Sequence, residues 1–242
     1  MSNGFSGLAP EERIITALDC SRDEALELAS KLSGTATWMK VGMTLYYAEG
    51  PSIVKALKDY GLKVFLDLKF FDIPHQVRGA AYSAVASGAD MITMHTLGST
   101  EMCRAGVEGA RAAAKDMGRE EPVTLGITVL TSFDDATLAS VGVARPVVEQ
   151  VPALAGIARE SGLSGVVASP QEAAQLRALL GPDAYIVTPG VRPAGSAAGD
   201  QKRIATPAAA VAAGASHLVI GRPITQAADP VAAFAAIVDE LR

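Results

Sequence analysis

Cysteine and histidine are scarce in this chain of 242 residues, which contains two cysteines and three histidines. Cys20 and Cys103 form no C-x-x-C pair and no disulfide framework, so we expect reduced thiols in a cytoplasmic protein. With so few candidate ligands, a structural zinc site is not expected, and the sequence shows no pattern for any other metal or for an organic cofactor. The N-terminus lacks the basic and apolar regions of a signal peptide.

Positive charge is also in deficit, since 21 Lys and Arg against 26 Asp and Glu give a formal net charge of −5. Nucleic-acid binders and membrane-surface binders rely on an excess of basic residues, so neither kind of partner is expected. The uncharged stretch at residues 204–221 is rich in alanine and too polar for a bilayer helix. Because the net charge is negative, any anionic ligand must be held by local Lys, Arg or backbone N–H groups.

Hydrophobic residues make up 49% of the chain, enough for a large core, and they recur in a regular order of apolar run, turn and helical stretch. Most of the runs are continuous rather than alternating, which is typical of parallel strands covered on both faces. Strands are predicted at residues 14–19, 37–41, 63–69, 91–95, 123–129, 165–168, 184–187 and 217–220. Helices are predicted at residues 21–33, 50–60, 74–87, 100–117, 147–161, 170–180, 206–213 and 225–241.

Eight strands that alternate with eight helices predict an α/β fold, a single-domain (β/α)8 TIM barrel over residues 1–242. A doubly wound open sheet uses the same alternation and is the alternative. Ser21 with Glu24 three residues later has the spacing of a helix capping box. No shift in composition marks a domain boundary, and the long polar loop at residues 192–201 follows the seventh predicted strand.

Charged residues gather where the first three predicted strands end, which is where barrel enzymes carry their active sites. Asp19 ends the first strand and Lys40 lies near the end of the second. Asp67 and Lys69 are two residues apart, so they are predicted to share one face of the third strand. An isolated D-x-K is more simply explained as a structural ion pair. With Lys40 and Asp72, however, a closed four-charge network becomes possible, which would hold an ammonium group ready to donate a proton.

A second group of residues follows the last two predicted strands. Residues 188–192 have the sequence TPGVR, and Gly221 with Arg222 follows the eighth strand. Glycine lets backbone N–H groups approach an anion, and arginine offers a bidentate fork. Each pair alone also fits a surface turn, but two pairs at adjacent strand ends indicate a phosphorylated substrate.

The segment LDLKFFDIP at residues 66–74 resembles the signature of the orotidine 5′-phosphate decarboxylase family. Segments that resemble the other blocks of this family, in the same order, are ALD (17–19), MKVG (39–42), LTS (130–132), TPGVRP (188–193), GDQKR (199–203) and VIGRPI (219–224). The resemblance implies a carboxy-lyase that converts orotidine 5′-monophosphate to uridine 5′-monophosphate in de novo pyrimidine biosynthesis, with no metal and no cofactor.

The resemblance also implies a role for particular residues. Lys69 would protonate C6 of the pyrimidine, while Asp67, Lys40 and Asp72 would complete the charged set. The implied substrate contacts are Asp19 and Lys40 at the ribose, Asp67 beside the departing carboxylate, Thr131 at the pyrimidine, and Arg192, Gln201, Gly221 and Arg222 at the 5′-phosphate. The loop at residues 192–201 would close over the phosphate.

The family is homodimeric, with active sites at the interface, so the resemblance implies that Asp72 and Ile73 reach the site of the partner. Phe71 stands where the family usually has His, and His75-Gln76 where it usually has Asn-Thr. The second of these family residues contacts the ligand. The Gln76 amide is therefore expected to replace that contact or to leave it to another group.

Two other functions compete with this interpretation. One is a Mg²⁺-dependent phosphosugar decarboxylase or aldolase on the same barrel, in which metal bound by carboxylates stabilises an enediolate. The other is a non-catalytic barrel that binds a nucleotide. Simple phosphate binding does not require four charges at the other end of the pocket, which disfavours the second function.

Overall fold

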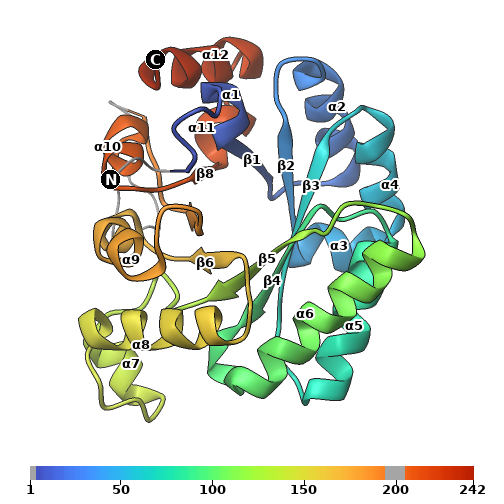
Figure 1. Ribbon diagram of the computed structural model, residues 1–242. Helices are drawn as coiled ribbons and strands as arrows, with labels where there is room; N and C mark the ends of the chain where they lie inside the picture. The colour runs from blue at the N-terminus through green and yellow to red at the C-terminus, as the bar shows by residue number, and fades with distance from the viewer. Residues whose placement is uncertain (1–3, 194–204) are drawn as a thin grey trace.

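The computed structural model of the chain describes residues 4–193 and 205–242. In this part of the chain, parallel strands form a closed barrel in the order β1 to β8, and β8 pairs with β1 (Figure 1). The strands are β1 (Ile14–Leu18), β2 (Trp38–Gly42), β3 (Lys63–Phe70), β4 (Met91–His95), β5 (Val123–Ile127), β6 (Gly165–Val167), β7 (Tyr185–Thr188) and β8 (His217–Ile220). The predicted barrel is confirmed, and the open sheet is excluded because the sheet has no edge.

Helices surround the barrel on the outside (Figure 1). They are α1 (Pro10–Arg13), α2 (Arg22–Leu32), α3 (Met43–Glu49), α4 (Ser52–Asp59), α5 (Pro74–Ala86), α6 (Ser99–Asp116), α7 (Asp135–Ser140), α8 (Val147–Glu160), α9 (Ala173–Leu180), α10 (Pro207–Ala212), α11 (Arg222–Thr225) and α12 (Pro230–Glu240), with 3₁₀ turns η1 (Thr96–Gly98) and η2 (Pro170–Glu172). None of the helices in the described ranges combines the length and apolar character that a bilayer crossing requires.

Each of the eight predicted helices has a counterpart in the structure, but several bounds differ, and the short helices α1, α3, α7 and α11 were not predicted. The capping box of α2 is present, since Ser21 accepts a hydrogen bond from the Glu24 N–H and the Glu24 carboxylate accepts one from Ser21. The helix predicted at residues 50–60 was placed too early, because Gly50 has a φ of 64° and ends the unpredicted helix α3. The helix predicted at residues 225–241 begins only at Pro230, because Thr225 ends the short helix α11 and Asp229 caps α12.

Alternation along the strands separates two apolar layers. One layer fills the space between the strands and the helices. The other fills the barrel interior and consists of Ile15, Ala17, Trp38, Phe65, Met91, Leu125, Val187 and Val219. Side chains two residues further along a strand point to the same face. Two residues after Ala17, Trp38 and Phe65 come Asp19, Lys40 and Asp67. These three residues therefore lie at the carboxyl end of the apolar interior.

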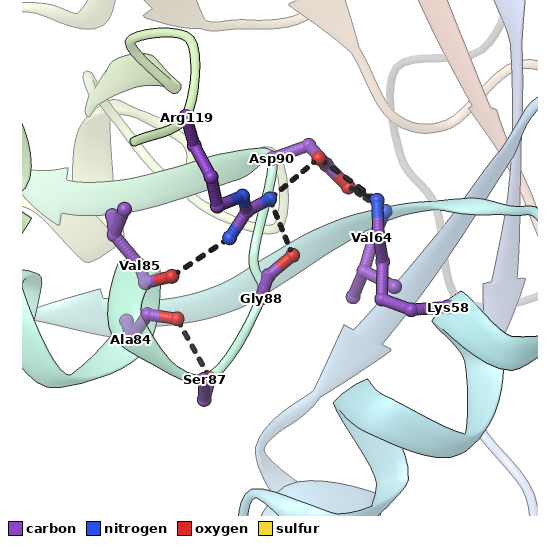
Figure 2. A network of polar contacts seen from close by, with 8 residues as sticks. All are labelled: Lys58, Val64, Ala84, Val85, Ser87, Gly88, Asp90 and Arg119. Carbon is purple, nitrogen blue, oxygen red and sulfur yellow. Dashed lines mark hydrogen bonds and ion pairs between the residues drawn. The ribbon is translucent and has the colours of Figure 1, made fainter. Parts of the chain in front are cut away.

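The amino-terminal end of the barrel is held by a separate polar network (Figure 2). The Asp90 carboxylate accepts hydrogen bonds from the Val64 N–H at 2.7 Å, from Lys58 Nζ at 2.7 Å and from an Arg119 nitrogen at 3.0 Å. Arg119 also donates to two backbone carbonyls at the end of α5. These bonds join α4, β3, β4 and the segment after α6 at the end of the barrel opposite Asp67.

His217 is buried in the same amino-terminal part of the barrel. Its ring stacks on Tyr185 with 5.3 Å between the ring centroids and meets the Trp38 ring edge-on. Burial, together with the positive charges of Arg13 and Lys63, lowers the pKa of His217 to about 3. The imidazole is therefore neutral in the folded protein throughout the physiological pH range.

This shift predicts a loss of stability in mild acid. Below the ordinary histidine pKa of 6.5, the unfolded chain binds a proton at residue 217 and the folded chain does not until the pH approaches 3. The free energy of unfolding should therefore fall by up to about 1.4 kcal/mol per pH unit between those values on account of this group. Denaturant unfolding at several pH values gives the free energy of unfolding as a function of pH. The slope of this free energy against pH should be shallower for His217→Gln, whereas His75→Gln, a control at an exposed histidine, should retain the wild-type slope. Equal slopes for wild type and His217→Gln would contradict this account.

Candidate active site

Ionisable side chains from three neighbouring strands meet at the carboxyl end of the barrel. Asp19 follows β1, Lys40 lies in β2, and Asp67 and Lys69 lie in β3. Lys40 Nζ is 3.1 Å from Asp19 Oδ1 and 3.9 Å from Asp67 Oδ2. Lys69 Nζ is 2.8 Å from the same Asp67 oxygen. These four residues form a charge array in which one oxygen of Asp67 faces two ammonium groups.

Burial differs across the charge array. The side chains of Lys40 and Asp67 are 10% and 12% exposed, whereas Lys69 is 27% and Asp19 is 70% exposed. A charge with so little contact with water is costly unless it is paired, so Lys40 and Asp67 depend on each other and on their neighbours. Of the two ammonium groups in the array, that of Lys69 is the more exposed to solvent.

The backbone around Lys69 is irregular. Lys69 has a φ of 53°, in the left-handed region that residues with side chains rarely adopt. The β3–β4 ladder pairs Leu66 with Ile92 and resumes only at Phe70 with Met94. The chain of β3 thus advances by more residues than β4 over this interval. The predicted shared face of Asp67 and Lys69 is confirmed by their 2.8 Å contact, but a bulged strand produces it rather than a regular one.

Thr93 in β4 was missed by the sequence analysis and contacts the charge array directly. Its hydroxyl donates to Asp67 Oδ1 at 3.0 Å and accepts from the Lys69 backbone N–H at 2.9 Å. One available signal was its position, two residues after the inward-facing Met91, where a polar side chain would point into the barrel.

Gly42 was noted only as part of the MKVG segment, yet its missing side chain leaves room for an ion pair. A Cβ atom at this position would lie 3.1 Å from Lys40 Nζ and 3.2 Å from Asp19 Oδ1. Those distances are tighter than ordinary van der Waals contacts, so a larger residue would displace one of the two charged groups. Glycine at the end of β2 therefore supports the geometry of the charge array.

His95 lies at the end of β4, beside the charge array. Burial and the positive charge of Lys69 lower its pKa, against a smaller opposing effect of Asp67. Its ring centroid is 5.6 Å from that of Phe71, and its buried Nδ1 has no hydrogen-bond partner within the described residues. The imidazole is therefore a neutral neighbour of the array rather than a third cation.

Asp72 does not join the charge array of its own chain. The residue is exposed, its Oδ1 accepts a hydrogen bond from the Ile73 N–H at 2.6 Å, and it forms no ion pair with any described residue. The expected closed network of four charges therefore forms only in part within one chain, because β3 ends at Phe70 and residues 71–73 are exposed. Ile73 and Gln76 are exposed as well.

A cavity of about 620 Å³ opens beside the charge array. The predicted site residues that line it are Asp19, Lys40, Arg192, Gly221 and Arg222, whereas Asp67 and Lys69 lie outside its lining, behind Lys40 in the charge array. Its volume falls within the range of small-molecule sites. The structure thus brings the residues that follow β7 and β8 to the same cavity as the end of β1 and β2.

The other predicted substrate contacts are Thr131 and the loop that contains Gln201. Thr131 follows β5, is half-buried and lies outside the lining of this cavity. Gln201 and most of the loop at residues 192–201 lie outside the described residues. On either side of that gap, Val191 and Ala205 form a parallel bridge, and the Arg192 N–H donates to the Ala205 carbonyl at 2.9 Å.

Side chains that could ligate a metal are spread out in the described part of the chain. Within residues 4–193 and 205–242, no three His, Cys, Asp or Glu side chains group closely enough to hold a metal ion. The arrangement of the charge array is instead two ammonium groups around one carboxylate. Such an arrangement can repel or attract the charged groups of a bound molecule and can supply a proton from Lys69.

A closed barrel with paired, largely buried charges beside a cavity at the carboxyl ends of its strands is the arrangement found in (β/α)8-barrel enzymes. A sequence model of the Orotidine 5'-phosphate decarboxylase / HUMPS family matches residues 12–237. The chain therefore belongs to the Orotidine 5'-phosphate decarboxylase / HUMPS family.

Individual relatives agree over nearly the whole chain. The chain is 49% identical over 233 residues to the orotidine 5'-phosphate decarboxylase of Moorella thermoacetica, covering 96% of this chain and 92% of that protein. It is 50% identical over 230 residues to the protein of the same name from Halorhodospira halophila, covering 95% of each. Among solved structures, orotidine 5'-phosphate decarboxylase from Lactobacillus acidophilus superposes with a TM-score of 0.85 at 38% identity, covering 96% of this chain and 99% of that one.

Proposed function

We propose that the protein decarboxylates orotidine 5′-monophosphate to uridine 5′-monophosphate in pyrimidine biosynthesis, in the cytoplasm and without a metal or cofactor. The observation that carries the proposal is the Lys69 ammonium, 2.8 Å from Asp67 Oδ2 in an array that adjoins a cavity lined by two arginines. The names of the relatives, which align over nearly the full chain, support the same reaction.

The reaction creates a charge that the substrate cannot spread. When the bond between C6 and the carboxylate breaks, CO₂ leaves and the electron pair stays on C6, in the plane of the ring and outside its π system. We assign Lys69 to stabilise this pair and then to transfer a proton from Nζ to C6. The lysine is left as a neutral amine, which takes up a proton from solvent before the next turnover.

Asp67 and Lys40 hold Lys69 and set the field around it. Asp67 would lie beside the departing carboxylate, and repulsion between the two negative groups is relieved as CO₂ forms. An ion pair at 4 Å contributes about 4 kcal/mol at an effective dielectric constant near 20. Enzymatic accelerations of about 10¹⁷-fold require about 23 kcal/mol. One lysine is therefore not enough, and binding at the remote phosphate must help to align the substrate.

The cavity provides places for the rest of the substrate. Asp19 and Lys40 would bind the ribose hydroxyls, as their 3.1 Å pair lines the cavity. The phosphate would lie at Arg192, Gly221 and Arg222, where arginine forks and a glycine backbone suit an anion. We assign Gln201 to the same phosphate, Thr131 to the pyrimidine, and the Gln76 amide to the family's threonine position.

We further propose a homodimer with shared active sites. Exposed apolar side chains follow the carboxyl ends of β2, β3 and β4, and they are Met43, Tyr47, Phe71, Ile73 and Leu97. Asp72 lies among them and has no ionic partner among the described residues of its own chain. A second copy of the chain that covers this face would bury the apolar groups. Asp72 and Ile73 of each copy would then lie at the charge array of the other copy.

A metal-dependent phosphosugar decarboxylase or aldolase on the same barrel is the alternative reaction, and a nucleotide-binding barrel without catalysis is the alternative class. The loss of orotidine 5′-monophosphate absorbance, measured with and without EDTA, and a calorimetric titration with the same compound separate the three functions. We expect turnover that EDTA leaves unchanged. Turnover abolished by EDTA would contradict the metal-free reaction, and binding in the titration without turnover would leave the nucleotide-binding barrel.

Lys69→Ala should abolish turnover, with kcat lowered by more than about 10⁴-fold, because the variant has no proton donor at C6. Substrate should still bind, since the phosphate and ribose contacts remain, and calorimetric titration would measure this. Lys55→Ala is the matched control, because Lys55 is an exposed lysine that pairs with Asp59 on α4. A near-normal kcat for Lys69→Ala would refute the assignment.

Arg222→Ala should lower kcat/KM by about 10- to 100-fold through the lost charged hydrogen bond to phosphate. Steady-state kinetics measure the effect, and addition of free guanidinium ion should restore part of it. Arg104→Ala on the exposed surface of α6 is the control. An unchanged kcat/KM for Arg222→Ala would exclude Arg222 from the phosphate site.

The shared site predicts complementation between two inactive variants. Lys69→Ala and Asp72→Asn are each expected to be nearly inactive alone. Subunits mixed and re-equilibrated should regain roughly a quarter of the wild-type rate, because half of the dimers are hybrids and each hybrid has one intact site. A mixture that forms hybrid dimers but stays inactive would show that each site is built from a single chain.

A further inference from the structure

Thr93 is the one uncharged side chain that hydrogen-bonds both members of the Asp67–Lys69 pair among the described residues. It lies in β4 with no exposed surface, so it cannot touch a molecule in the cavity. Its hydroxyl is 3.0 Å from Asp67 Oδ1 and 2.9 Å from the Lys69 backbone nitrogen. Any effect of Thr93 on a reaction must therefore act through those two residues.

The direction of both hydrogen bonds is determined by chemistry. A backbone N–H can only donate, so the Thr93 oxygen accepts from Lys69. A threonine hydroxyl has a single proton, and that proton is then directed to Asp67 Oδ1. With Oδ1 engaged in this way, Oδ2 is the oxygen that faces the Lys69 and Lys40 ammonium groups at 2.8 and 3.9 Å.

The same hydroxyl supports an unusual backbone. Lys69 has a φ of 53°, and regular β3–β4 pairing is interrupted between Leu66 and Phe70. The Lys69 N–H thus bonds to a side chain on β4 where a regular ladder would supply a carbonyl. A strained conformation of this kind persists only where the surrounding structure holds it in place.

We propose that Thr93 is a positioning residue that sets the Lys69 ammonium at the reacting carbon, by orienting the Asp67 carboxylate and by holding the Lys69 backbone in its left-handed conformation. The inference rests on the proposed decarboxylation and adds a residue to it. Loss of the hydroxyl would free the carboxylate to rotate and would leave the Lys69 N–H without its partner. The ammonium would then move relative to the substrate, while the phosphate contacts at the other end of the cavity stay intact.

The test compares Thr93→Val with Thr93→Ser. Valine keeps the shape and removes the hydroxyl, so kcat should fall about 10²-fold while KM for orotidine 5′-monophosphate changes little. Serine keeps the hydroxyl and should restore most of kcat. Thermal unfolding of each variant shows whether it is folded, and if Thr93→Val is not, Thr93→Cys replaces it as a variant of similar size with a much weaker hydrogen-bonding group.

Thr96→Val is the matched control. Thr96 is also fully buried, and its hydroxyl donates to the Ile127 carbonyl at 2.8 Å, away from the charge array. This variant should lose stability and keep the wild-type kcat. The inference is overturned if Thr93→Val has a near-normal kcat, if Thr93→Ser is equally impaired, or if Thr96→Val shows the same loss.

The activity of the wild-type protein distinguishes a failure of this inference from a failure of the proposed function. If the wild type does not convert orotidine 5′-monophosphate, the proposed function is wrong and the role of Thr93 in it is overturned as well. If the wild type is active and Lys69→Ala is not, a normal kcat in Thr93→Val refutes the positioning role alone.

Discussion

The arrangement of the site depends on one carboxylate, that of Asp67. One of its oxygens accepts a hydrogen bond from Thr93, and the other faces the ammonium groups of Lys69 and Lys40. A carboxylate that is 12% exposed is stable only with such partners, and the two lysines depend on it in the same way. Because all three charges are held by one another, none can move without disturbing the rest. That mutual restraint is the condition for stabilising a charge that appears during a reaction.

The two ends of the barrel divide stability and chemistry between them. At the amino-terminal end, Asp90 is fully engaged by Lys58, Arg119 and a backbone N–H, and aromatic rings pack around His217. At the carboxyl end, the backbone is bulged and Lys69 has a strained φ. A rigid amino-terminal end of the barrel allows the carboxyl ends of the strands to hold a backbone geometry that is unfavourable in isolation. This is the usual division of roles in barrels of this class.

The fold and the family do not by themselves define the reaction, which depends on the residues of the site. The family description covers more than one name, and the same barrel accommodates metal-dependent chemistry on phosphosugars. The distinguishing feature in this chain is the pairing of ammonium groups with Asp67 beside the cavity. That arrangement suits the proposed reaction, in which fixed charge and a lysine proton act on a carbanion. Asp72 is exposed and lies outside the array of its own chain, which is the observation behind the proposed shared site.

The sequence by itself determined the barrel, because continuous apolar runs that alternate with helical stretches are local signals, readable without knowledge of distant contacts. It also predicted that Asp67, Lys69 and the arginines of the cavity lie at one end of the barrel, since all of them follow or end strands there. Only the tertiary structure decided the bulge at Lys69, the hydrogen bonds of Thr93 and the separation of Asp72 from the array. Thr93 and Asp67 are 26 residues apart in the chain, and their contact arises from the β3–β4 register. Register and strained dihedral angles result from contacts between distant segments, which local patterns do not encode.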